Sequence, residues 1–169
     1  DQPDVQDAKD RTKSKIAEYK ATGAVSPGPF VSVADAPAAL EAFLAQAKAS
    51  DYIAINAYLR RNPAMEAALT ALRLKLRAKT GCATTVGFGP RFLHSTGQLH
   101  KGGADNGLFL QITADSAADI DIPGQGMTFG ALERAQALGD YEALAARNRR
   151  ILRIHLEKGA ALKDLLAKM

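Results

Sequence analysis

Four polar side chains recur at helical spacing in the segment that follows the β-branched run Thr84-Thr85-Val86. The segment has Pro90 near its start, and proline suits the first position of a helix. Residues that follow at spacings of three, four and three share one face of such a helix. These positions hold a cation, an imidazole, an amide and a second cation: Arg91, His94, Gln98 and Lys101. We expect this face to meet an anionic, oxygen-rich ligand, because it would make a poor core.

Two histidines in this segment are candidates for chemistry or binding. His94 is the natural acid–base group, since the unperturbed pKa of imidazole, roughly 6.5, lies close to physiological pH. By residue type alone, a hydrogen-bonded structural histidine is the more common role. His100 and Lys101 precede Gly102-Gly103, which permits a close backbone approach to a ligand, and a surface loop is an equal alternative. Arg91 can pair either with a phosphate or with a neighbouring carboxylate.

The start of the chain carries a second polar pattern, Asp1-Gln2-Pro3-Asp4-Val5-Gln6-Asp7-Ala8-Lys9. On the helix predicted here, Gln2, Gln6 and Lys9 fall on one face. A solvated lysine is the ordinary role for Lys9 when it is considered alone. Gln2 and Gln98 are candidates either for ligand hydrogen bonds or for structural ones.

Together the two segments resemble the phosphoglucose isomerase family. Asp1-Gln2, Val5 and Lys9 match the family pattern Asp-Gln-x-x-Val-Glu-x-x-Lys, and His94-Ser95-Thr96-Gly97-Gln98 is similar to the family's His-Ser-x-Gly-Gln element. The His segment usually comes first, and the reversed order here resembles that of bifunctional transaldolase/phosphoglucose isomerases. The resemblance extends through Gly107–Thr113 and Phe129–Ala137.

The resemblance implies an aldose–ketose isomerase that interconverts glucose 6-phosphate and fructose 6-phosphate without a cofactor. His94 and Lys9 would be the ring-opening residues, and the substrate contacts would come from Gln2, Gln98, Arg91, Lys101 and His100. It also implies a sugar-isomerase subdomain, upstream isomerase and transaldolase domains as partners, and a homodimer. Since Asp1-Gln2 already lies inside the family pattern, we expect the chain to be part of a longer polypeptide.

Two departures from the family keep an alternative open. Gln6 stands where the family usually has Glu, and no Gly-rich, Glu-bearing segment supplies the base for the enediol step. The isolated chain should therefore have an incomplete site. The alternative is a non-catalytic sugar-phosphate-binding or assembly domain of the same fold. A purely structural module is a third hypothesis, which the polar pattern around His94 opposes.

Composition narrows the class of protein. The 169 residues match one domain, 47% of them are hydrophobic, and the formal charge of +4 is scattered along the chain. We therefore expect no nucleic-acid partner. Cys82 is the only cysteine and should be a buried structural thiol, which excludes an intramolecular disulfide. No apolar stretch approaches the roughly 20 residues of a membrane span, and we expect a cytoplasmic protein.

The order of predicted elements indicates an α/β fold, a three-layer sandwich with a mainly parallel sheet. Residues 1–22 should form an N-terminal helix, 23–35 a connector with a β-like run at 30–33, and 36–169 the α/β core of a single domain. Within the core we expect helices over 37–48, 63–79, 90–101 and 160–168, a further helix that follows Phe129 and carries Gln136, and strands over 52–58, 82–86, 108–113 and 151–156.

The remaining basic residues have simpler interpretations. His155 should be an exposed strand residue, and Arg149, Arg150 and Arg153 form either a basic patch or a solvated edge. The three histidines lack the spacing and the carboxylate company of a metal site, so we predict no metal.

Overall fold

A five-stranded parallel sheet forms the centre of the computed structural model, which describes residues 3–116 and 118–168. The strand order is β1-β7-β4-β2-β3, and every neighbouring pair is parallel. The strands are β1 (Val31–Ser32), β2 (Tyr52–Tyr58), β3 (Ala83–Phe88), β4 (Gly107–Ala114) and β7 (Arg150–Leu156).

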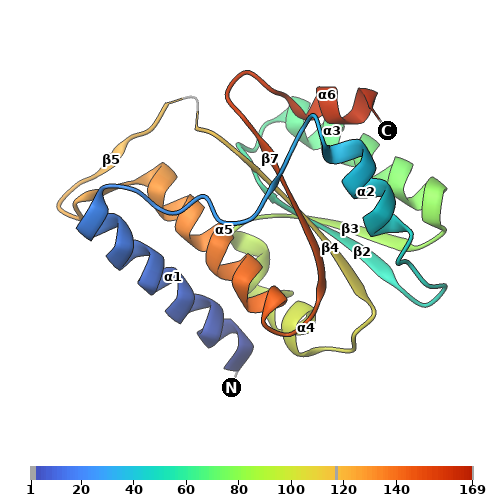
Figure 1. Ribbon diagram of the computed structural model, residues 1–169, viewed down its shortest axis with the longest axis horizontal. Coiled ribbons are helices and arrows are strands. Elements are labelled where there is room, and N and C mark those ends of the chain that lie inside the picture. The colour runs from blue at the N-terminus through green and yellow to red at the C-terminus, as the bar shows by residue number, and fades with distance from the viewer. Residues whose placement is uncertain (1–2, 117, 169) are drawn as a thin grey trace.

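Helices cover both faces of this sheet, so the predicted three-layer α/β sandwich is confirmed (Figure 1). Between β4 and α5 the chain forms a small antiparallel hairpin that is not among the predicted elements. The helices are α1 (Pro3–Thr22), α2 (Ala36–Leu44), α3 (Pro63–Thr80), α4 (Gly97–Gly102), α5 (Phe129–Ala145) and α6 (Leu162–Ala167), with the 3-10 helix η1 (Arg91–His94) and the hairpin strands β5 (Asp121–Ile122) and β6 (Met127–Thr128).

The two faces of β2 show how the sheet separates the core into parts. Ile53, Ile55 and Ala57 point to the core that α2, α3 and α6 share with the sheet. Ala54 and Tyr58 point to the opposite side, where α4, α5 and η1 lie. A strand buried on both faces reads as a continuous apolar run, which is why its bounds, residues 52–58, were predicted correctly.

Helix α1 lies side by side with α5 and also contacts α4 (Figure 1). The two long helices approach closely at Gly139, where an added Cβ would meet Thr12 Oγ1 at 2.5 Å and the Ala8 carbonyl oxygen at 3.0 Å. Only glycine allows this contact. The packing of α1 against α5 and α4 places the amino-terminal motif beside the segment that follows β3, which contains η1 and α4.

The helix predicted over 90–101 is wrong as a single element. Ser95 and Thr96 separate η1 from α4, and the hydroxyls of both bond to the Phe92 carbonyl oxygen, at 3.2 and 3.0 Å. Ser and Thr side chains offer the backbone an alternative to continued helix in this way. The break means that the four polar residues of the segment do not share one helical face.

Two other predicted bounds need correction. Helix α2 ends at Leu44, four residues earlier than predicted, and the Asp51 carboxylate accepts the Lys48 backbone N–H at 2.8 Å in the turn that follows. The terminal helix spans only Leu162–Ala167. By contrast α3 begins and ends as predicted to within one residue, with Asn62 as its cap and Gly81 in the left-handed conformation after it.

Candidate functional site

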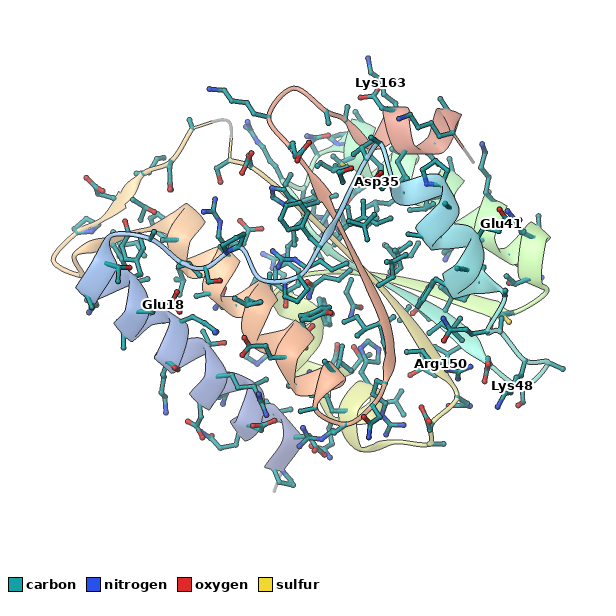
Figure 2. All side chains as sticks on the ribbon, viewed as in Figure 1. Glu18, Asp35, Glu41, Lys48, Arg150 and Lys163 are labelled. Carbon is teal, nitrogen blue, oxygen red and sulfur yellow. The ribbon has the colours of Figure 1, made fainter. Side chains whose placement is uncertain are left out.

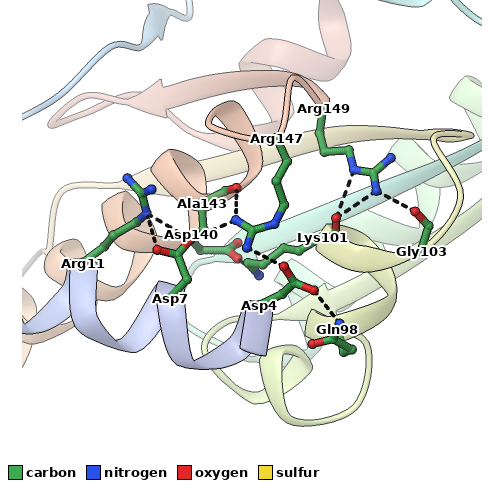
Figure 3. Close-up of polar contacts among 10 residues, drawn as sticks. All are labelled: Asp4, Asp7, Arg11, Gln98, Lys101, Gly103, Asp140, Ala143, Arg147 and Arg149. Atoms are coloured by element: carbon green, nitrogen blue, oxygen red, sulfur yellow. Dashed lines mark hydrogen bonds and ion pairs between the residues drawn. The ribbon is translucent and has the colours of Figure 1, made fainter. Parts of the chain in front are cut away.

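The two motif segments, more than 90 residues apart in sequence, lie against each other (Figure 3). Gln98 Nε2 in α4 donates a hydrogen bond of 2.5 Å to Asp4 Oδ2 in α1. Val5 packs beside Gly97, where an added Cβ would lie 3.5 Å from Val5 Cγ2, and an added Cβ at Gly102 would clash with the Asp4 carboxylate. The fold therefore joins the start of the chain to the His-Ser-Thr-Gly-Gln element.

Arg147, two residues after the end of α5, fixes this arrangement from the other side (Figure 3). Its guanidinium pairs with Asp4 and donates to Asp7 Oδ2 at 2.8 Å. Arg11 also donates to Asp7, at 3.0 Å. The hydrogen bond from Arg147 is the main reason that the pKa of Asp7 lies below its ordinary value. These carboxylates hold α1 against α5.

Lys9 and His94, the predicted catalytic residues, are both exposed. Neither side chain forms a hydrogen bond or ion pair with another residue in 3–116 or 118–168, and neither residue lines any of the four pockets described there. Gln6, on the same helix as Lys9, donates to Asp10 at 3.0 Å instead. As ring-opening residues of one enzyme, Lys9 and His94 would have to share a site. None of these pockets is that site, and the shared site stays a prediction.

Lys101 is not available to a ligand, which corrects its predicted role. Its side chain is fully buried and its Nζ lies 2.5 Å from Asp140 Oδ1 in α5, whose side chain is also fully buried. Burial raises the pKa of Asp140, and the ammonium of Lys101 opposes this effect. The pair is an internal ionic contact between α4 and α5.

Gln98 is likewise occupied by its bond to Asp4, whereas Arg91 is exposed and lines the largest described pocket. Gln2 lies outside the described residues.

His100 lies inside the fold, so the surface-loop alternative is wrong. The residue is 5% exposed and its ring sits among Tyr52, Phe92 and Phe109, with centroid distances of 6.3, 6.0 and 4.9 Å. Burial lowers its pKa to about 4, and the neighbouring Lys101 adds to this effect. The imidazole is therefore neutral near pH 7, and it lines the same pocket as Arg91.

The three arginines near the end of the chain are neither a free patch nor a solvated edge. Arg149 donates to the carbonyl oxygens of Lys101 and Gly103, and Arg150 pairs with Asp51 at 2.6 Å beside the loop that carries Lys48 (Figure 2). Arg153 is 4% exposed and donates to the Pro27 carbonyl oxygen at 2.6 Å.

His155 is also bonded rather than exposed. Its Nδ1 lies 2.8 Å from Thr113 Oγ1, and its Nε2 lies 3.3 Å from Asp115 Oδ1. Cys82 is buried, as predicted. Three carboxylates that bond to the polar residues discussed above were not identified from the sequence. They are Asp4, which bonds to Gln98, Asp51, which pairs with Arg150, and Asp140, which pairs with Lys101.

Two further features bear on the class of protein. Among residues 3–116 and 118–168, no group of three His, Cys, Asp or Glu side chains is arranged to hold a metal ion. None of the helices in these same residues has both the length and the apolar content needed to cross a membrane.

Comparisons with known proteins inform the fold alone. No family model matches the chain, and no curated protein matches it in sequence. A solved structure, a hypothetical protein from Thermus thermophilus, is similar with a TM-score of 0.58 and 18% sequence identity. The match covers 94% of this chain and 42% of that protein, so the chain spans less than half the length of this neighbour. At this identity the likeness supports the α/β fold and nothing about activity.

Proposed function

We propose that this chain is the C-terminal domain of a phosphoglucose isomerase fused to transaldolase, acting in the cytoplasm on glucose 6-phosphate and fructose 6-phosphate. The observation that carries the proposal is the contact between the two motif segments, made by Gln98 with Asp4 and by Gly97 with Val5. A shared role of the two patterns would require them to lie together, and this contact supports it.

The chemistry assigned to this domain is ring opening. A positioned imidazole can move a proton between the ring oxygen and the adjacent hydroxyl, which is the role of His94. A cation near the ring oxygen stabilises the negative charge that develops there, which is the role of Lys9. The exposure of both side chains supports these roles, because neither side chain is bonded to another described residue and both can reach a ligand. The base for the enediol step comes from an upstream segment.

The test is a coupled assay of isomerisation with the full-length polypeptide. The Lys9→Met/His94→Gln double variant should lose at least about 10²-fold in rate, the low end for acid–base catalysis. Lys13→Met is the matched control, because Lys13 is an exposed lysine on the same helix, and it should retain the rate. The isolated domain should bind phosphosugars weakly without turnover. Full activity in the double variant, or turnover by the isolated domain near that of a complete isomerase, would contradict the proposal.

A second candidate is the non-catalytic sugar-phosphate-binding or assembly domain. It is favoured by the internal contacts of Gln98 and Lys101, which remove two of the substrate contacts that the resemblance implies. The same assay separates the two functions. A full-length polypeptide that binds glucose 6-phosphate and never isomerises it would establish the second.

A further inference from the structure

The largest described pocket lies along β3, the strand at one edge of the sheet. Helix α3 forms one side, and η1 and α4 form the other. Its volume of about 770 Å³ is within the range of small-molecule sites, roughly 300–1,000 Å³. The walls are mostly apolar and include Val86 and Leu99, which are 36% and 56% exposed, with Leu69, Phe88 and Phe92.

Asn56, in the middle of β2, lines this pocket with a buried side-chain amide. The residue is 1% exposed, and its side chain forms no hydrogen bond with another residue in the described part of the chain. Its cross-strand neighbour Gln111 is equally buried, and only its Oε1 lacks a partner among the described residues, because Gln111 Nε2 donates to the Ala137 carbonyl oxygen at 2.9 Å. An unsatisfied buried polar group costs about 1–3 kcal/mol, so an apolar residue would serve the core better at position 56.

His100 is a second buried polar group on the same pocket. Neither ring nitrogen bonds to another residue in 3–116 or 118–168, and Nδ1 is enclosed. A neutral imidazole offers one donor and one acceptor, and the amide of Asn56 offers two N–H donors and an acceptor oxygen. Two adaptable donor–acceptor groups therefore converge on one cavity.

Arg91 gives the pocket its net charge. The other lining cation, Arg61, pairs with Glu66 at 2.6 Å and lies 5.5 Å above the centre of the Phe88 ring. Arg91 is exposed and has no ion pair with a described carboxylate. The pocket thus combines apolar walls, two inner hydrogen-bonding groups and a cation.

We propose that this pocket binds a heteroaromatic organic anion of the size of a nucleoside monophosphate. The apolar walls pack on the planar ring, Asn56 and His100 bond to its donors and acceptors, and Arg91 pairs with the phosphate. A free sugar phosphate, which is polar on all sides, fits these walls poorly. Lys9 and His94 do not line this pocket, whereas Arg91 and His100, which the resemblance gives as substrate contacts, do. The proposal assigns these two residues to a different ligand and needs no isomerase activity.

Calorimetric titration of the purified chain with adenosine 5′-monophosphate and with uridine 5′-monophosphate tests the site. At least one should bind at millimolar concentration or below, and Asn56→Leu and His100→Phe should each weaken it about tenfold or more, which corresponds to about 1.4 kcal/mol. Arg91→Gln should weaken binding of the nucleotide and leave binding of the parent nucleoside unchanged. Binding of neither nucleotide, binding that all three variants retain, or complete competition by inorganic phosphate would overturn the proposal.

Thermal unfolding separates a ligand-binding amide from a structural one. Asn56→Leu keeps the branched shape of the side chain and removes an unpartnered polar group, so its midpoint should equal or exceed that of the wild type. Gln111→Leu is the matched control and should lower the midpoint, because it leaves the Ala137 carbonyl unpaired. If Asn56→Leu lowers the midpoint as much as Gln111→Leu does, the amide is structural and the inference fails.

Discussion

The short helices η1 and α4 carry the two halves of one polar pattern, yet they place it in opposite environments. In η1, Arg91 and His94 are exposed. In α4, Gln98 bonds to Asp4 and Lys101 pairs with the buried Asp140. Polar residues at helical spacing thus indicate a ligand face or an internal network equally well, and residues far away in sequence decide between the two.

The largest effect should come from the buried half of the pattern. Lys101→Met leaves the Asp140 carboxylate buried without its cation, and breaking such a pair costs about 3–5 kcal/mol. Urea unfolding of the variant measures this loss. The double variant Lys101→Met/Asp140→Leu should recover most of the stability. A single variant as stable as the wild type would show that Lys101 is not part of the core.

The exposed half should affect rate without affecting stability. In the full-length polypeptide, His94→Ala should lower the rate of isomerisation about 10²–10⁴-fold more for the cyclic sugar than for an open-chain substrate. Only the cyclic form needs ring opening. Stopped-flow assays of the two substrates give the comparison. Equal losses on both would assign His94 a different role.

His100 stands beside Lys101 in the buried half, and it should make stability depend on pH. Its pKa of about 4 in the folded chain lies below the ordinary value of 6.5, so the unfolded chain binds the proton more readily. Stability should therefore fall as the pH drops from roughly 6.5 toward 4, by about 2 kcal/mol between pH 7 and pH 5. His100→Phe should lack this component when urea unfolding is repeated at both values. An unchanged dependence on pH in the variant would place the titrating group elsewhere.

The smallest effect on stability should come from the contacts that Arg147 makes with helix α1. Arg147→Met removes the contacts with Asp4 and Asp7, and partly exposed pairs of this kind contribute about 1 kcal/mol or less. The pKa of Asp7 should rise toward its ordinary value, and amide exchange in α1 should accelerate. Lys13→Met, which breaks the exposed pair with Asp10, is the control and should change neither. If the two variants behave alike, Arg147 does not hold α1 in place.

Much of the fold follows from local patterns. The run Tyr52–Tyr58 is apolar on both faces, and α3 has a proline at its start and a glycine after its end, so both elements were predicted nearly to the residue. The short hairpin of β5 and β6 was missed because two-residue strands carry no periodic signal. The helix break at Ser95-Thr96 was missed because a pattern of spacings does not include the hydroxyl bonds that end η1.

Less of the candidate site could be predicted, because its partners are distant in sequence. Lys101 and Asp140 are 39 residues apart, and Gln98 and Asp4 are 94 apart. From the sequence, Lys101 and Gln98 were identified as candidate site residues. Nothing in the sequence indicated that Asp140 and Asp4 would be their partners. The aromatic side chains around His100 likewise come from separate elements, so its low pKa has no local signature.

The most direct test of the joined motif segments is an NMR titration of the isotope-labelled chain with glucose 6-phosphate. The two segments meet through Gln98 and Asp4, so weak binding should shift the backbone amides around both Lys9 and His94 together. The ring signals of His94 should move as well, while those of the hydrogen-bonded His155 should not. Shifts confined to the pocket of Asn56 and His100, or shifts at only one of the two segments, would contradict a shared site.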